Sequence, residues 1–225
     1  MSHSPQRGSA AALRQFLGVP FRAQTYRNLA YLALAFPLGL AYFVGVSVGL
    51  STGLGLAVTL VGLPLLVLTL AAAVGLAGFE AKLASWLVGV DATPPAALRG
   101  MDQPLDGVDG LVDATKRLVT TPTTWTGLLL VLLKLAFGVV AFTALVTAGA
   151  VAGSLLTAPL FYDAPGVTYT TGAYAVDTLP EALAAAGLGV LVALVSLHLL
   201  NGLAKLGAVA TALLLGDGVD PATEA

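Results

Sequence analysis

The fold is decided by residues 28–79, which read NLAYLALAFPLGLAYFVGVSVGLSTGLGLAVTLVGLPLLVLTLAAAVGLAGF and contain no charged side chain. About 20 apolar residues are enough for a helix to cross the hydrocarbon core of a bilayer, so this stretch is long enough to cross twice. The chain is expected to turn in the glycine-rich centre, residues 45–55. The sequence therefore predicts a membrane hairpin with spans at about residues 29–49 and 54–76.

The composition extends this interpretation to the whole chain. Of the 225 residues 57% are hydrophobic and 10% are charged, with a mean hydropathy of +0.92, whereas a soluble domain carries about 25% charged residues. Two later apolar stretches predict spans at about residues 125–148 and 181–206. We therefore expect an all-α, polytopic membrane protein with four transmembrane helices in one domain (residues 24–216), between a leader (1–23) and a cytoplasmic tail (217–225).

Three amphipathic stretches predict helices that lie on the membrane surface, at residues 10–21, 76–90 and 108–119. Each places apolar residues at helical spacing beside charged residues, the pattern of interfacial helices. For residues 10–21 the alternative is a frayed leader to the first span.

The placement of basic residues predicts the topology. All ten Lys and Arg lie near the N-terminus, around the linker at residues 91–121, at Lys134 or at Lys205. The first turn and the loop at residues 157–178 contain none. The positive-inside rule then places both termini and the linker in the cytoplasm and the loop outside the cell membrane.

The two halves of the chain show a weak internal similarity. Residues 25–43 resemble residues 124–142 at a constant offset of 99, with five of 19 positions identical. Because each half begins and ends on the same side, the expected arrangement is a parallel two-helix repeat about an axis along the membrane normal. Chance similarity between such common residues is the alternative. Glycines four residues apart also predict close helix packing in each half, at Gly45, Gly49, Gly53, Gly149 and Gly153.

Polar residues within the predicted spans are the candidates for a functional site, because ionisable groups there are costly and often functional. Lys134 and His198 are expected at similar depth, and His198, Asn201 and Lys205 share one face of the fourth helix. These four residues would form a polar pocket near the cytoplasmic leaflet. The alternative is that Lys134 extends to the interface and that His198 makes an internal hydrogen bond.

The outer loop is a second candidate surface, since it is the only sizeable segment expected to face outward. Its aromatic side chains could touch a ligand or another protein, although membrane anchoring is the alternative. These residues are Phe161, Tyr162, Tyr169 and Tyr174. The chain has no Cys and shows no catalytic, phosphate-binding, metal-binding or nucleic-acid-binding motif, so we expect no enzymatic activity, no cofactor and no nucleic-acid partner.

Several apolar segments resemble the prokaryotic "putative sensor" membrane domain, the N-terminal four-helix module of some two-component histidine kinases. They are YRNLAYLALAFPLGLAYF at residues 26–43, GLGL at 53–56, TLVGLPLL at 59–66 and APLFY at 158–162. The resemblance covers about residues 24–216 and implies a four-helix module with a signal-input role and no catalytic residues. Only nine residues follow Gly216, so no kinase core is expected.

Three classes of function follow from these observations. The first is a stand-alone sensory or regulatory membrane module that acts through a separate partner, such as a histidine kinase or another signalling protein. The second is a small transporter or channel subunit, which should show polar residues at several depths along a path. The third is a structural or lipid-organising protein, which the surface helices would suit. Lys134 and His198, both expected near one leaflet, favour the first class. The oligomeric state is left open.

Overall fold

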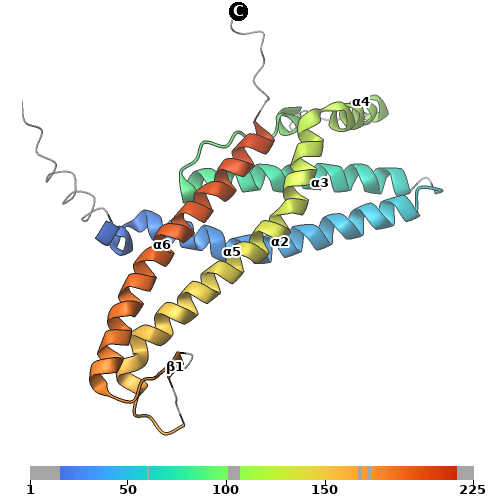
Figure 1. Ribbon diagram of the computed structural model, residues 1–225. Helices are drawn as coiled ribbons and strands as arrows, with labels where there is room; N and C mark the ends of the chain where they lie inside the picture. The colour runs from blue at the N-terminus through green and yellow to red at the C-terminus, as the bar shows by residue number, and fades with distance from the viewer. Residues whose placement is uncertain (1–15, 60, 101–106, 167–168, 172–173, 217–225) are drawn as a thin grey trace, which may run out of the picture. The chain divides into compact units, whose positions relative to one another are not determined.

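The computed structural model describes residues 16–59, 61–100, 107–166, 169–171 and 174–216 (Figure 1). It confirms the all-α fold. The long helices are α2 (Ala23–Gly55), α3 (Gly62–Leu83), α5 (Pro122–Phe161) and α6 (Leu179–Leu215). The described chain has four helices that are long and apolar enough to cross a membrane, with α3 counted together with the turn that follows it, as expected of a multi-pass membrane protein.

Shorter elements connect the long helices. The 3-10 helices are η1 (Val19–Phe21) and η3 (Ala96–Gly100), the π-helix is η2 (Ala84–Val88), and α4 (Gly107–Thr120) precedes α5. The loop between α5 and α6 contains one antiparallel pair of two-residue strands, β1 (Thr170–Thr171) and β2 (Tyr174–Ala175). Most of the surface helix expected at residues 10–21 lies outside the described residues.

The first turn comes later than the glycine-rich sequence suggested. Helix α2 continues to Gly55, and the chain turns between Leu56 and Val61 before α3 begins. In a bilayer a break in the helix would leave backbone N–H and C=O groups without hydrogen bonds. The chain therefore stays helical even through glycines, which are tolerated inside a span. The glycines of this segment therefore lie within α2 and not in the turn itself.

Local sequence signals explain where two of the long helices begin: a proline at the first helical position of α5, and the Thr178-Leu-Pro-Glu181 pattern at the start of α6. Helix α5 begins at Pro122, a position where the missing N–H is not needed. At the start of α6, Glu181 Oε2 accepts hydrogen bonds from the backbone N–H groups of Asp177 and Thr178, each 3.1 Å long. This return contact is the capping box that the Thr178-Leu-Pro-Glu181 sequence predicts.

The segment after α3 departs from the expected surface helix. The π-helix η2 continues α3 and ends at Gly89. Gly89 has a φ of +76°, a backbone conformation that residues with a side chain rarely adopt. Leu83 and Leu87 are buried, while Trp86 is 69% exposed. A π-turn holds more residues than an α-turn, which shifts the register so that the apolar residues of this segment no longer share one face. The Arg27 side chain of α2 donates a hydrogen bond to the Trp86 carbonyl.

The chain forms two compact units, which are described separately. The first comprises residues 27–142 and 203–225, and the second comprises residues 1–26 and 143–202. In the second unit the C-terminal part of α5 and the N-terminal part of α6 pack closely, since a Cβ on Gly189 would lie 2.9 Å from that of Leu155. At its other end the Thr25 hydroxyl donates a 2.8 Å hydrogen bond to the Val19 carbonyl.

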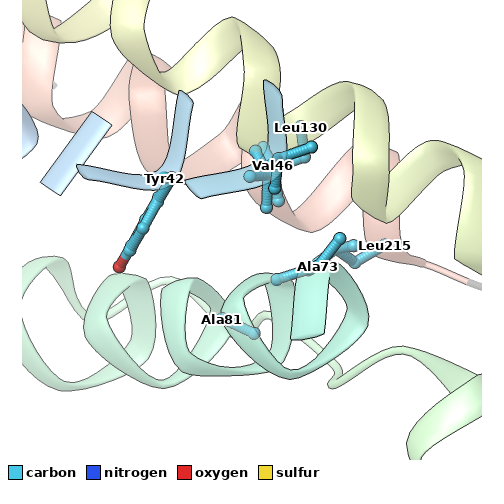
Figure 2. Close-up of a cluster of buried hydrophobic side chains, with 8 residues drawn as sticks. Tyr42, Val46, Ala73, Ala81, Leu130 and Leu215 are labelled. Atoms are coloured by element: carbon cyan, nitrogen blue, oxygen red, sulfur yellow. The ribbon is translucent and has the colours of Figure 1, made fainter. Parts of the chain in front are cut away.

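The core of the first unit joins all four long helices (Figure 2). Three alanines of α3 are spaced four residues apart and fully buried, which lets the other helices approach closely. The Tyr42 ring reaches from α2 toward α3 (Figure 2). The buried members are Tyr42, Val46, Ala73, Ala77, Ala81, Leu130, Val131 and Leu215.

Helices α2 and α5 touch through their backbones at two glycines. A Cβ on Gly39 would lie 2.6 Å from the Lys134 carbonyl oxygen, and one on Gly138 would lie 2.5 Å from the Ala35 carbonyl oxygen. Both pairs, 39 with 138 and 35 with 134, differ by 99 residues. The contact is therefore reciprocal, and the internal repeat has a structural counterpart here. The arrangement of the two halves about an axis along the membrane normal stays a prediction.

The glycines singled out from their spacing behave differently from one another. A Cβ on Gly49 would lie 2.4 Å from Thr69 Oγ1, and one on Gly53 would lie 2.6 Å from Leu66, so both pack against α3 in the hairpin. At Gly45, Gly149 and Gly153 no described heavy atom lies within 4 Å of an added Cβ, apart from the local helix backbone. The four-residue spacing therefore marks close contacts at Gly49 and Gly53 only, and the contact between α2 and α5 uses Gly39 and Gly138.

The crossing can be tested by adding one methyl group. Gly39→Ala places its Cβ against the α5 backbone, which cannot move aside like a side chain, and should lower the unfolding free energy by about 1–3 kcal/mol. Gly45→Ala, on the same helix with open space around it, is the matched control and should stay within about 1 kcal/mol of wild type. The measurement is reversible unfolding in mixed micelles, and equal effects of the two substitutions would contradict the contact.

Candidate functional site

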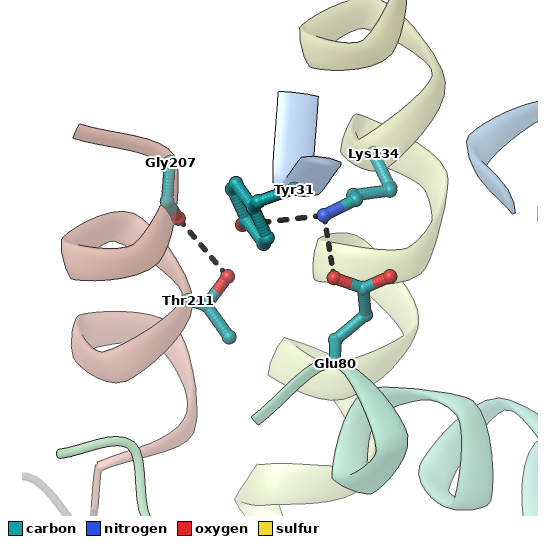
Figure 3. Close-up of polar contacts among 5 residues, drawn as sticks. All are labelled: Tyr31, Glu80, Lys134, Gly207 and Thr211. Carbon is teal, nitrogen blue, oxygen red and sulfur yellow. Dashed lines mark hydrogen bonds and ion pairs between the residues drawn. The ribbon is translucent and has the colours of Figure 1, made fainter. Parts of the chain in front are cut away.

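A polar cluster joins three helices inside the first unit (Figure 3). Lys134 of α5 lies with its Nζ 2.5 Å from Glu80 Oε2 of α3, and it donates a 3.2 Å hydrogen bond to the Tyr31 hydroxyl of α2. The side chains of Lys134 and Glu80 are 3% and 0% exposed. A pair of opposite charges is thus enclosed by the spans.

Aromatic rings enclose the rest of the lysine ammonium group. Its Nζ lies 4.4 Å from the ring centroid of Tyr31 and 5.6 Å from that of Phe137, distances at which a ring face attracts a cation. Helix α6 closes this side, because a Cβ on Gly207 would lie 2.4 Å from Phe137 Cζ. The Thr211 hydroxyl in turn donates to the Gly207 carbonyl, 3.0 Å away (Figure 3).

The cluster also contains two polar atoms without a hydrogen-bond partner among the described residues. They are Glu80 Oε1 and the Tyr42 hydroxyl. A buried carboxylate oxygen without a donor is costly. These two unsatisfied atoms make the cluster a candidate for a structural switch.

The energy of such a pair depends on both partners being present. Removing two charges from water costs several kcal/mol per ion, and their attraction offsets this only while they stay together. Replacing both with apolar groups is often neutral or stabilising, so a buried pair is weak evidence for a role in stability. In membrane proteins, by contrast, a buried ionisable residue with a named partner is a functional hypothesis by default.

Lys134 is the one residue of the predicted four-residue pocket that takes part in this cluster. It does not extend to the interface, because Glu80 compensates its charge inside the protein. Lys205 belongs to the same unit and is exposed on α6. His198 and Asn201 belong to the second unit, and the joint pocket stays a prediction.

His198 and Asn201 have local partners in the second unit. His198 Nδ1 lies 2.9 Å from the Leu194 carbonyl oxygen, and its ring stacks on Phe16 at a centroid distance of 4.4 Å. Asn201 donates a 3.3 Å hydrogen bond to the Thr25 hydroxyl. These contacts fit the alternative of an internally hydrogen-bonded histidine, and they join α6 to the residues that precede and begin α2.

The outer-loop aromatics are placed in part. Phe161 ends α5 and is exposed, while Tyr162 and Tyr169 are half-buried. Tyr174 lies in β2, and its side chain is outside the described part. Their role in contacting a ligand stays a prediction.

Sequence reasoning missed Glu80, which it treated only as the end of the charge-free stretch. The sequence did contain a signal. Glu80 directly follows the 52 uncharged residues 28–79, and Lys134 is the single charged residue within the third predicted span. Charges in hydrocarbon need a partner, so the isolated base should have been matched with the nearest acid bordering another span.

The comparison with protein families shows to which family the chain belongs. The family model described as "Putative sensor" matches residues 31–215, a range that includes nearly all of the four long helices and the whole polar cluster. The chain belongs to the "Putative sensor" family. Searches of curated proteins and of solved structures returned no match.

Membership in the "Putative sensor" family gives the buried cluster a context. The description supports a sensory role and suggests a non-enzymatic one. Tyr31, Tyr42, Glu80, Lys134 and Phe137 all lie within the matched range.

The buried pair can be tested by a double-mutant cycle. Lys134→Met removes the cation and leaves Glu80 buried alone, which should lower the unfolding free energy by about 3–5 kcal/mol. Adding Glu80→Gln removes the orphaned charge and should restore most of the loss. Lys205→Met, at an exposed lysine on α6, is the control and should change stability by no more than about 0.5 kcal/mol. Strictly additive losses would show that the two side chains do not pair.

Proposed function

We propose that the chain is a stand-alone sensory and regulatory module of the cell membrane that passes its state to a separate signalling protein, for example a histidine kinase. The observation that carries this proposal is the "Putative sensor" match over residues 31–215. The range contains the helices expected to cross the membrane, so the family resemblance applies to the membrane domain as a whole. No enzymatic step is part of the proposal.

The polar cluster supplies the two-state element that a sensor needs. A stimulus changes a protein only if it favours one of two arrangements. In this proposal Glu80 bonds either to Lys134 alone or also to Tyr42, and the change between the two arrangements moves α3 relative to α2. The side chains of the outer loop, Phe161, Tyr162 and Tyr169, are candidate input contacts, and the pocket around His198 is a further candidate.

A small transporter or channel subunit is the alternative. It is favoured by the burial of ionisable residues inside the spans, since such residues also mark ion and proton pathways. Glu80 and Lys134 neutralise each other at one place, however, whereas a pathway needs sites at several depths. We therefore favour sensing.

The function can be tested in the organism that carries the gene. Deleting the gene should change a defined set of transcripts, and the wild-type gene should restore them. The double variant Glu80→Gln with Lys134→Met is expected to fold, so it should accumulate at the wild-type level and fail to restore the response. Full restoration by the double variant would exclude the cluster as the switch. Loss of uptake of a solute without a change in transcripts would support transport instead.

The orientation is a separate part of the proposal. The positive-inside rule places both termini and the linker in the cytoplasm. A reporter that is active only in the cytoplasm, fused after Ala225, should therefore be active, and the same reporter inserted in the loop between α5 and α6 should be inactive. The reverse pattern would overturn the orientation and leave the sensory role untouched.

A further inference from the structure

One described side chain of helix α4 is buried against α3, and others are exposed. Leu118 is buried against α3, whereas Val112 and Val119 are 58% and 43% exposed. Lys116, between them in sequence, is exposed as well. Two exposed branched apolar side chains and an exposed lysine thus lie on one short helix.

The positions of these residues around the helix follow from its geometry. Successive residues of an α-helix are about 100° apart, so Val112 and Val119 lie next to each other. Their stripe begins about 100° from Leu118, and Lys116 follows on its far side. The apolar arc of α4 is therefore wider than its contact with α3, and its exposed part is bordered by a lysine.

The chain holds this stripe close to the bilayer. Helix α4 ends at Thr120, and α5, one of the helices able to span the membrane, begins only two residues later at Pro122. The Trp125 indole N–H donates a 2.9 Å hydrogen bond to the Val119 carbonyl, which fixes the corner between the two helices. Trp125 is half exposed, and tryptophan with a wet polar edge is typical of the headgroup level.

We propose that Val112, Lys116 and Val119 form a binding surface for anionic phospholipid. The two valines enter the boundary between headgroups and acyl chains, and the Lys116 ammonium pairs with a lipid phosphate by extending its alkyl stem along that boundary. A protein partner fits this stripe less well, because stable protein interfaces use about 20–30 residues a side. Lipid, by contrast, is expected next to the start of α5, because α5 is long and apolar enough to cross the membrane.

This inference goes beyond the sensory proposal, because it gives α4 a ligand of its own. Leu118 packs against Leu70 and Val74 of α3. Helix α3 also carries Glu80. The lipid surface thus has a direct mechanical connection to the helix that holds the buried acid.

The placement can be tested with single thiols, because the chain has no native Cys. Val112→Cys and Asp113→Cys carry an environment-sensitive fluorophore in nanodiscs of phosphatidylcholine with or without phosphatidylglycerol. The label at position 112 should be quenched by brominated lipid, and more strongly when phosphatidylglycerol is present. The label at position 113, on the polar side of the helix, should stay in water. Val119→Cys gives a second lipid-facing readout should the first variant fold poorly.

The lysine is tested in the labelled Val112→Cys protein. Lys116→Gln should weaken the preference for phosphatidylglycerol about fivefold, the ratio expected for one lysine near an anionic surface, and high salt should have the same effect on the parent. Lys205→Gln is the matched control and should leave the preference unchanged. Equal quenching at positions 112 and 113, or no effect of phosphatidylglycerol, would overturn the proposal. Because the assay contains no signalling partner, such a failure would leave the proposed function untouched.

Discussion

A charge inside a membrane-spanning bundle needs a partner, and the packing around Lys134 follows from this need. Water is not available there to solvate the ammonium group, so Glu80, the Tyr31 hydroxyl and two aromatic rings take its place. Glu80 comes from α3 and Tyr31 from α2, while Phe137 lies on α5 itself and packs against Gly207 of α6. The cluster therefore fixes which faces of α2, α3, α5 and α6 meet, in a set of helices whose other side chains are mostly interchangeable apolar groups.

Close approach at glycine makes this cluster geometrically possible. At the crossing of α2 and α5 the backbones touch through Gly39 and Gly138, which brings the lysine of one helix within reach of the tyrosine of the other. The internal repeat is broken at this place, because Ala35 occupies the position equivalent to Lys134. A reciprocal crossing with a charge on only one side gives the two halves of the domain different chemical roles.

Family membership and geometry support the same interpretation from independent directions. The "Putative sensor" match covers nearly all of the four long helices, and the cluster within them has two buried polar atoms without a hydrogen-bond partner among the described residues. Helix α4 packs on α3 through Leu118, and α3 also carries Glu80. The proposed lipid surface and the proposed switch therefore involve the same helix.

The sequence by itself determined the class of the fold and the approximate spans, because hydrophobic length is a property of a segment alone. It also determined the start of α5 at Pro122 and the capping box of α6, which depend only on neighbouring residues. It identified Lys134 as a candidate but not its partner, since 54 residues separate Lys134 from Glu80. Only tertiary structure decides which helix faces meet. For the same reason it alone selected Gly39 and Gly138 from among many glycines, and it placed the turn after Gly55, where packing against α3 keeps α2 helical.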